Sequence, residues 1–224
     1  MAKQSNYQEY TVKGYPLAGQ TPRTCYYWSG DEALYDITDQ LSDGYVWELV
    51  QSLRNDTSVQ DMMKVEYRTE LKVTKGKELE THWNIGAAYE GLSVGIGGSE
   101  KTFESTETTD SKTHSYEVPV PAKTTVYFSQ KVYRFKTHMW FINWAWGERS
   151  RVGGYGNYSP AHVDGYVLIR SHEHWASQQE AKGSTSTWVD EARDDEQFKW
   201  TRMFENCTSQ CRDYLEDRRA TIPG

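Results

Sequence analysis

The chain has 224 residues, a formal net charge of −7, and 14% aromatic residues that include 9 Trp and 16 Tyr. This length suits one domain whose core is large enough to fold without disulfide staples. The acidic balance, with no window of concentrated Lys and Arg, argues against nucleic acid as a partner. The aromatic residues are typical either of a Trp-rich β core or of surfaces that are apolar on one side and wet on the other, such as glycan sites and membrane interfaces.

Residues 1–61 are predicted to form loops, short strands and one short helix. Breakers crowd the first thirty residues: Gly14, Pro16, Gly19, Pro22 and Gly30. Further on, apolar residues recur at roughly helical spacing and are interrupted by a Gly: Ile37, Leu41, Val46, Leu49, Val50 and Leu53. We therefore expect a short strand or turn followed by a helix-like stretch between residues 31 and 53.

Residues 62–170 are predicted to be a region of long β-strands. Val65, Tyr67, Thr69, Leu71 and Val73 alternate with charged residues, which is the pattern of a strand with one wet face. The same phase continues beyond a turn at residues 75–77, and its members are Leu79, Thr81, Trp83, Ile85, Ala87 and Tyr89. Gly91 then shifts the register, and Leu92, Val94 and Ile96 take over. We expect strands over 64–73, 79–89 and 92–96.

A polar, Thr-rich stretch follows, in which Phe103 is the only large apolar residue between Gly97 and Ser115. Strand signals return after Val118-Pro-Val-Pro121 and continue to Phe135. Residues 139–146 are apolar on both faces and are expected to be buried or to lie against another surface. Residues 166–170 are predicted to be the last strand of this region.

The C-terminal piece, residues 171–224, is predicted to be helical. From Trp188 onward, large apolar residues recur at intervals of three or four, through Trp200, Phe204, Cys207, Cys211 and Tyr214. This spacing predicts an amphipathic helix of about seven turns that docks on the sheet or binds a partner. Three cysteines make no disulfide framework, and His172-Glu173-His174 is more typical of a solvated polar run than of a metal site. We expect neither a metal nor a cofactor.

Three motifs follow one another in the central region, over about residues 65–135. They are Glu80-Thr-His-Trp-Asn-Ile-Gly86, the Gly/Ser/Thr-rich stretch, and Ser115-Tyr-Glu-Val-Pro-Val-Pro-Ala-Lys-Thr-Thr-Val-Tyr127. With these motifs the region resembles the aerolysin and epsilon-toxin family of β-pore-forming proteins. The resemblance implies a mainly β (β-rich α+β), elongated sheet of long antiparallel strands, here with a C-terminal amphipathic helix. It also implies a chain that binds a membrane lipid or a cell-surface glycan, forms a homo-oligomer on membranes and inserts a hairpin.

Within this resemblance, the inserting hairpin is predicted between about residues 89 and 115, with its tip near residues 99–101. Alternation favours Leu92, Val94 and Ile96, with Phe103, as the lipid-facing residues, because Ser93, Gly95 and Gly97 lie between them. Glycan or lipid recognition is predicted for exposed rings in and beside the Gly-rich loop 147–160: Tyr155, Tyr158, Trp140, Trp144 and Trp146. Core burial is the favoured alternative for the three tryptophans, since they lie in a continuous apolar run.

Two other functions stay open at this level: a glycan- or lipid-binding module without a lytic step, and an enzyme with an aromatic-lined pocket. The sequence contains no nucleophile elbow, P-loop, dinucleotide glycine pattern or paired-His zinc helix, so an enzyme is the less favoured of the two. The N-terminus has no apolar h-region, and no stretch approaches the roughly 18 apolar residues of a transmembrane helix. We therefore expect a soluble chain without a signal peptide, stored in the cytoplasm or exported without a leader.

Overall fold

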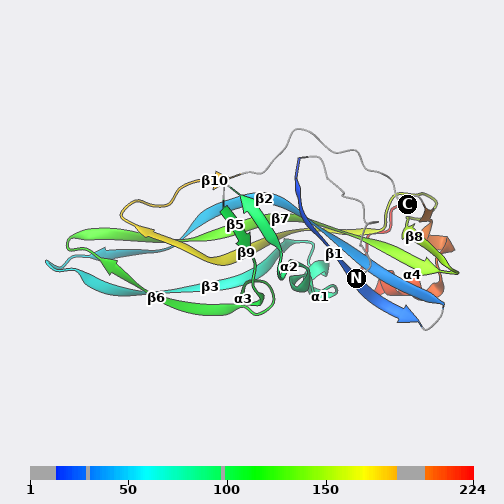
Figure 1. Ribbon diagram of the computed structural model, residues 1–224, viewed down its shortest axis with the longest axis horizontal. Coiled ribbons are helices and arrows are strands. Elements are labelled where there is room, and N and C mark those ends of the chain that lie inside the picture. Colours follow the sequence, from blue (N-terminus) through cyan, green and yellow to red (C-terminus); the bar gives the residue numbers. More distant parts are fainter. Residues whose placement is uncertain (1–13, 29–30, 97–98, 186–199) are drawn as a thin grey trace.

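The protein is an elongated sheet of long antiparallel strands with small helices on one side (Figure 1). The computed structural model describes residues 14–28, 31–96, 99–185 and 200–224. Its strands lie in the spatial order β1 (Leu17–Trp28), β2 (Glu32–Asn55), β7 (Thr124–Ala145), β9 (His162–Ser177), β3 (Asp61–Lys75) and β6 (Lys112–Val120). β8 (Glu148–Val152) pairs with β7, β10 (Ser184–Thr185) with β2, and β11 (Thr201–Arg202) runs parallel to β8. The predicted fold class, mainly β with long antiparallel strands and a C-terminal helix, is confirmed.

The helix-like stretch predicted between residues 31 and 53 is wrong, because this stretch is the 24-residue strand β2. Two irregularities in its pairing with β7 explain the error, one between Ser42 and Tyr45 and one between Leu49 and Gln51. Each bulge changes which residues face the core, so the apolar positions lose their period of two and imitate helical spacing.

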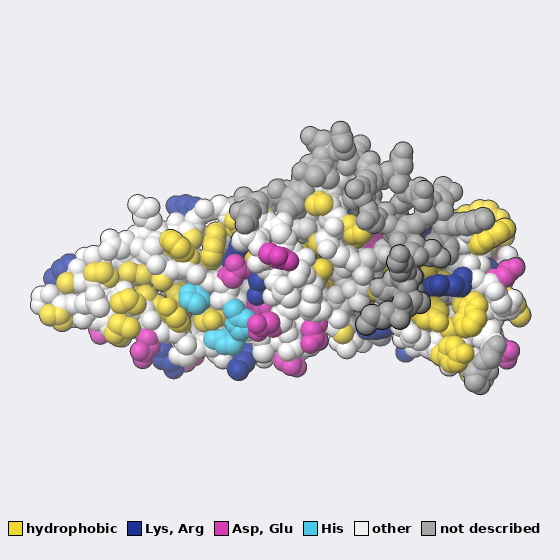
Figure 2. Space-filling view, in the orientation of Figure 1, with side chains coloured by type: hydrophobic (Ala, Val, Ile, Leu, Met, Phe, Trp, Pro, Cys, Tyr) yellow, Lys and Arg dark blue, Asp and Glu magenta, His cyan; other side chains and the backbone are white. Residues whose placement is uncertain are grey.

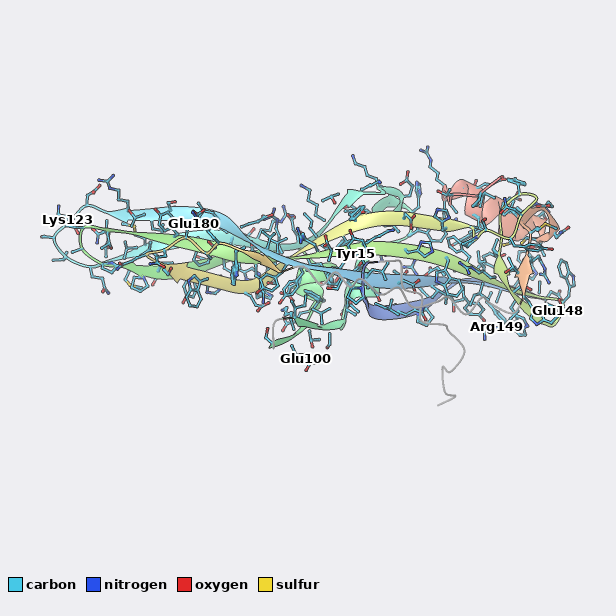
Figure 3. The ribbon with its side chains drawn as sticks, turned by 90° about the horizontal axis from the view of Figure 1, so that it is seen from above. Tyr15, Glu100, Lys123, Glu148, Arg149 and Glu180 are labelled. Atoms are coloured by element: carbon cyan, nitrogen blue, oxygen red, sulfur yellow. The ribbon has the colours of Figure 1, made fainter. Side chains whose placement is uncertain are left out.

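β3 changes partner along its length and thereby divides the molecule into two parts. Residues Glu70–Lys75 pair with β9, whereas residues Asp61–Thr69 pair with β6. The β3–β6 pair therefore forms a second layer over β2 and β7 near the end marked by Lys123 (Figure 3). Buried side chains from all four strands fill the space between these layers: Leu53, Val65, Val118, Val120, Val126 and Phe128.

The larger core lies over the middle and the opposite end of the sheet. Its sheet side includes Phe135, Phe141 and Ile169, and its cover comes from the chain between β3 and β6 and from the C-terminal piece. Trp83, from the chain between β3 and β6, contacts both the sheet and the C-terminal piece. The centroid of its ring lies 5.0 Å from that of Phe141 in β7, and its Nε1 donates to the carbonyl oxygen of Arg218 at 3.3 Å.

The C-terminal helix is shorter than predicted. α4 spans Ser209–Asp217 and follows the 3-10 helix η1 (Phe204–Asn206), while residues 188–199 of the predicted helix lie outside the described residues. Thr208 starts α4 as an N-cap, and its Oγ1 accepts from the backbone N–H of Cys211 at 3.1 Å. The side chains of Cys211 and Leu215 lie on the buried face of α4, and the three cysteines are free thiols.

Gly165 of β9 provides a test of how closely β3 and the segment after it pack on the sheet. A Cβ at this position would lie 2.5 Å from the carbonyl oxygen of Lys75 and would also meet Leu79 Cδ1. We expect Gly165→Ala to lower the free energy of unfolding by about 1–3 kcal/mol, because backbone has to move. Gly95→Ala is the matched control, since nothing lies within 4 Å of its Cβ. Denaturant midpoints measure both, and equal midpoints would contradict the described packing.

Candidate functional site

The chain between β3 and β6 forms a separate layer on the sheet, and residues 76–111 are named the insertion segment here. It contains α1 (Glu78–Thr81), α2 (Gly86–Tyr89), the hairpin of β4 (Ser93–Ile96) and β5 (Ser99–Thr102), and α3 (Ser105–Thr108). β3 and β6 are paired up to Thr69 and Lys112, so the segment leaves the sheet and returns to it on neighbouring strands. Figure 3 shows Glu100 of β5 standing off the side of the sheet near the middle of the molecule.

The strand predicted over residues 79–89 is wrong for this state, because α1 and α2 occupy that stretch. Leu79 and Trp83 are four residues apart, as are Ile85 and Tyr89, and all four side chains are buried. A spacing of four keeps two side chains on the same side both of a strand and of a helical turn, so the sequence fits either structure. The chain leaves β3 at Gly76, directly after Lys75, where a φ of +78° turns it towards α1.

The predicted lipid-facing residues all lie against the sheet in this state. Val94, Ile96 and Phe103 are buried, and Leu92 is half-buried. The predicted tip at residues 99–101 lies in the strand β5 in this state, where Ser99 pairs with Ile96. That these side chains face lipid in a membrane stays a prediction.

A buried carboxylate fastens the insertion segment to the sheet. Glu107 of α3 is fully buried, and its two oxygens accept from Lys101 Nζ at 2.9 and 2.8 Å. They also accept from the backbone N–H of His172 in β9 at 2.7 Å and from that of Glu104 at 3.0 Å. Glu107 therefore joins β5, α3 and β9 through charge-assisted hydrogen bonds, which are the stronger kind.

Besides the apolar contacts of Val73, the insertion segment meets β3 through polar groups. A polar cavity of about 260 Å³ separates them, and its lining includes Arg68, Glu70, Asn84 and Thr109. Arg68 Nη2 donates to Ser111 Oγ at 2.7 Å across this boundary. Groups of this kind can exchange protein partners for water at little net cost.

Histidines cluster beside α3, where β3, β6 and β9 come together, and Figure 2 shows them as one group on the surface. The rings of His114 and His172 have centroids 4.6 Å apart, and His174 stacks on Phe128 at 5.1 Å. His172 Nε2 lies 3.0 Å from Thr106 Oγ1 of α3, and His114 Nε2 lies 3.0 Å from Thr69 Oγ1. Burial lowers the pKa of His114 below its usual value, and the neighbouring His172 and Lys112 lower it further.

Exposed aromatic rings gather at the end of the molecule where β1, β2, β7 and β8 meet, and this surface is named the aromatic end. Its members are Tyr27, Trp28, Trp144, Trp146 and Trp200. Tyr27 pairs with Ala33, which pairs with Trp144 on the other side, and the carbonyl of Trp200 accepts from the N–H of Arg151. Figure 3 marks the same end by Glu148 and Arg149, and Figure 2 shows hydrophobic side chains exposed there.

Three tryptophans of the aromatic end expose more than half of their surface to solvent. Trp28, Trp146 and Trp200 have exposed fractions of 58%, 68% and 65%. The guanidinium of Arg202 lies 4.7 Å from the centre of the Trp146 ring, a cation–π contact that orients it. Trp146 also stands in the left-handed backbone conformation, at φ +54°, in the turn between β7 and β8. Several exposed tryptophans at one end are typical of a binding surface.

The predicted recognition residues separate into two groups. Trp140 is buried, as core burial requires, whereas Trp144 and Trp146 are exposed at the aromatic end. Tyr155 and Tyr158 are exposed in the loop between β8 and β9, at 46% and 65%. The sequence reasoning missed Tyr27, Trp28 and Trp200. A signal was present for Trp28, because in the sequence it precedes Ser29-Gly30 much as Trp146 precedes Gly147.

Among the described residues no group of three His, Cys, Asp or Glu side chains is arranged to hold a metal ion. None of the helices in the described part of the chain has the length and hydropathy needed to cross a bilayer.

No protein-family model matches the sequence, and no curated protein matches it. Two solved structures are loosely similar to it. One is the oligomeric pore-forming toxin pro-Monalysin, with a TM-score of 0.38, 10% identity, and coverage of 76% of this chain and 71% of that one. The other is parasporin-2, a Bacillus thuringiensis toxin that recognizes cancer cells, with a TM-score of 0.20, 15% identity, and coverage of 68% and 76%. The resemblance found in the sequence thus recurs as a loose structural likeness, and function has to be inferred from this chain's own geometry.

Glu107 gives a direct test of how the insertion segment is fastened. Glu107→Gln removes the charge that Lys101 binds and is expected to weaken the local anchoring by up to roughly 3–5 kcal/mol, the cost of breaking a buried pair. Hydrogen exchange should then rise in residues 99–111 while the β2–β7 ladder stays protected. Glu100→Gln is the matched control, since Glu100 is exposed on the same hairpin. Equal exchange in the two variants would contradict this role of Glu107.

Proposed function

We propose that the protein is a pore-forming toxin or defence protein in which residues 79–102 refold into a membrane-spanning β-hairpin. The observation that supports this most strongly is the register of β3 with β6. Paired residue numbers add to 181 throughout this ladder, from Asp61 with Val120 to Thr69 with Lys112. The same register, continued into the insertion segment, pairs Leu79 with Thr102.

Continued to its end, this register pairs Tyr89 with Leu92 and leaves Glu90-Gly91 as a two-residue turn. Gly91 already has a φ of +77°, which tight turns require of one central residue. In β4–β5 the paired numbers add to 195 instead. The two registers exclude each other, so the small hairpin has to open before the long one forms.

The continued register sorts the side chains into two faces. One face is almost entirely apolar around the turn: Leu79, Thr81, Trp83, Ile85, Ala87 and Tyr89 on one strand, and Leu92, Val94 and Ile96 on the other. The other face is polar or small: Glu78, Glu80, His82, Asn84, Gly86, Ala88, Ser93, Gly95, Gly97, Ser99 and Lys101. Strands with one lipid-facing and one water-facing side have this alternation.

The length of the apolar face also fits a bilayer. It extends from the turn to the row of Thr81 and Glu100, where the first charge appears on that face. This is nine residues per strand, 81–89 and 92–100, at the lower end of the roughly 9–11 that a tilted transmembrane strand needs. Compared with the predicted hairpin over residues 89–115, this one lies further towards β3. Leu92, Val94 and Ile96 keep a lipid-facing position, while Phe103 lies beyond Thr102 and on the other face.

A hairpin of two strands cannot cross a bilayer alone, because its outer edges would leave backbone groups without partners in lipid. Several copies have to contribute hairpins to one closed ring, so the proposal includes a homo-oligomer on the membrane.

The aromatic end is the proposed membrane contact. Tryptophan and tyrosine favour the boundary between headgroups and acyl chains, where one side of the ring is apolar and the other wet. β3 runs from Asp61 near the Lys123 end towards the aromatic end, and its pairing with β9 reaches Tyr166. A hairpin that continues β3 and β6 therefore grows towards the surface that carries Trp28 and Trp146.

A glycan- or lipid-binding module without a lytic step is the second candidate. The aromatic end favours it independently, because exposed rings such as Trp146 beside Arg202 suit stacking on a sugar or headgroup whether or not the insertion segment ever leaves the sheet. Release of a dye from vesicles distinguishes the candidates, since binding without leakage would leave only this one.

A disulfide between the strands of the small hairpin tests the refolding. Ser93 and Thr102 pair directly, and their hydroxyl oxygens lie 2.6 Å apart on the exposed face. Ser93→Cys with Thr102→Cys, once oxidised, should abolish leakage from vesicles and leave vesicle binding intact, because the bond fixes the register that must be lost. Reduction of the bond should restore leakage.

The control is Glu66→Cys with Ser115→Cys, an exposed pair in the β3–β6 ladder whose partners stay together in both registers. Oxidation of this control should not affect leakage. Leakage by the oxidised Ser93–Thr102 variant would overturn the hairpin proposal.

The membrane contact is tested by Trp28→Ala and Trp146→Ala. Each is expected to weaken binding to vesicles about tenfold, because burying one large apolar side chain contributes roughly 1.5–3 kcal/mol. Trp175→Ala is the matched control, since Trp175 is 56% exposed on β9 far from the aromatic end. Co-sedimentation with vesicles measures the three, and equal losses would show that the aromatic end has no special role.

A further inference from the structure

We propose that the polar cavity between β3 and the insertion segment is a binding site for a single sugar unit, and that a sugar bound there holds the segment on the sheet. The site follows from the geometry of the cavity alone. Its control over insertion rests on the proposed function, in which residues 79–102 leave the sheet.

The cavity lies between two walls that protein contacts hold in place. Arg68 and Glu70 of β3 belong to one wall, and the Nε of Arg170 lies 3.5 Å from Glu70 Oε1. Asn84 belongs to the other wall, and Arg23 of β1 donates to its carbonyl oxygen at 3.5 Å. The volume of about 260 Å³ equals the share of roughly nine waters in the liquid, which is room for one hexose. The site is therefore formed before a ligand arrives, as small-molecule sites usually are.

Backbone closes part of the cavity, and a small apolar area lies beside its polar groups. Gly86 of α2 and Thr108 of α3 both line it, and a Cβ on Gly86 would lie 2.3 Å from the carbonyl oxygen of Thr108. The two helical turns thus approach each other as closely as backbone allows. Ile85, which is buried, and Leu71, which is half-buried, provide the apolar area.

Three polar side chains of the lining have hydrogen-bonding capacity to spare. Among the described residues, neither the carboxylate of Glu80 nor the side-chain amide of Asn84 has a hydrogen-bond or ion-pair partner. Arg68 Nη2 donates to Ser111 Oγ at 2.7 Å and Nε lies 3.4 Å from Glu70 Oε2, but a guanidinium has five N–H donors. A carboxylate, an amide and a guanidinium can therefore all bind the same ligand.

These groups favour a neutral ligand that carries several hydroxyls. An anion would meet the carboxylates of Glu70 and Glu80, and a cation would meet the guanidinium of Arg68. An apolar ligand would leave all of these groups without partners. A hydroxyl both donates and accepts, so neighbouring hydroxyls of one sugar can donate to a carboxylate and accept from a guanidinium or an amide. The C–H groups of the sugar ring fit against Leu71 and Ile85.

Only the anchored state can bind this sugar. Glu80 and Asn84 belong to the part of the chain that leaves the sheet in the proposed hairpin, whereas Arg68 and Glu70 remain in β3. A ligand that binds one of two states shifts the equilibrium towards that state. At ten times its Kd, the sugar lowers the equilibrium constant for release about elevenfold. A sugar in this cavity is therefore an inhibitor of insertion rather than a membrane receptor.

Amide chemical shifts of the full chain without membranes test the site. D-glucose, D-galactose, D-mannose and N-acetyl-D-glucosamine are titrated separately in the millimolar range. At least one of them should move the signals of residues 68–71, 80–86 and 108–111 and reach saturation. The site proposal is wrong if none does so, or if the signals that move belong only to other parts of the surface.

A variant then tests the assignment of the polar groups. Glu80→Ala should weaken binding of that sugar about tenfold, because it removes an acceptor of charge-assisted hydrogen bonds. Glu80 is exposed, so the fold should persist. Glu90→Ala is the matched control, since Glu90 is an exposed carboxylate of the same segment outside the cavity lining, and it should bind the sugar like the wild type. Equal affinities of the two variants would refute the assignment.

Dye release from vesicles tests the control over insertion and separates it from the proposed function. The sugar that binds should slow leakage, whereas its L-enantiomer at the same concentration should not. Binding with undiminished leakage would refute the control over insertion and leave pore formation standing. Binding without leakage under any condition would support the sugar site and refute pore formation.

Discussion

One set of apolar side chains, at alternate positions from Leu79 to Ile96, constrains the whole structure, because water has to be excluded from it in every state. In the described state, Leu79, Trp83 and Tyr89 lie against the central sheet. Burying each such side chain contributes roughly 1.5–3 kcal/mol, so together they hold the segment firmly. Only another apolar environment can replace the sheet, and a bilayer is one that the continued β3–β6 register would fit.

The insertion segment is attached to the sheet by two kinds of contact. Its apolar contacts depend little on pH or salt, whereas its polar contacts depend on charge. The contacts of Trp83 and Phe103 with the core depend little on pH or salt. Those of α3 depend on charge, through the ion pair of Glu107 with Lys101. The charged contacts of the segment therefore lie at the point where it rejoins β6, and its apolar contacts lie further along the chain.

The sequence predicted the long strands β3 and β7, because their apolar residues recur regularly over many residues without a change of phase. It failed for β2, where bulges near Gly44 and Val50 break the phase, and bulges are not visible in a pattern of apolar residues. It failed for residues 79–89 for a different reason. Their alternation is real, but the monomer buries the same side chains with two helical turns, and composition alone cannot tell which burial is in use.

The candidate site was only partly predictable for a similar reason. Tyr155 and Tyr158 lie in a Gly-rich loop, and such loops are exposed in most proteins, so their positions could be inferred. The aromatic end could not, because Trp28, Trp144 and Trp200 come from segments far apart in the chain and meet only when β1, β7 and β11 end at the same edge. Exposure of that kind is a tertiary property.

The order of the strands along the chain has a consequence for how the protein is made. The insertion segment packs on Tyr133 and Phe135 of β7 and on Val167 and Ile169 of β9, all of which are synthesised after it. β2 likewise waits for its partner, since Glu32 pairs with Ala145. Contacts between residues so far apart in the chain form slowly. A growing chain therefore carries an uncovered apolar stretch until β9 is complete, and such a stretch is prone to aggregate while it waits for its partners.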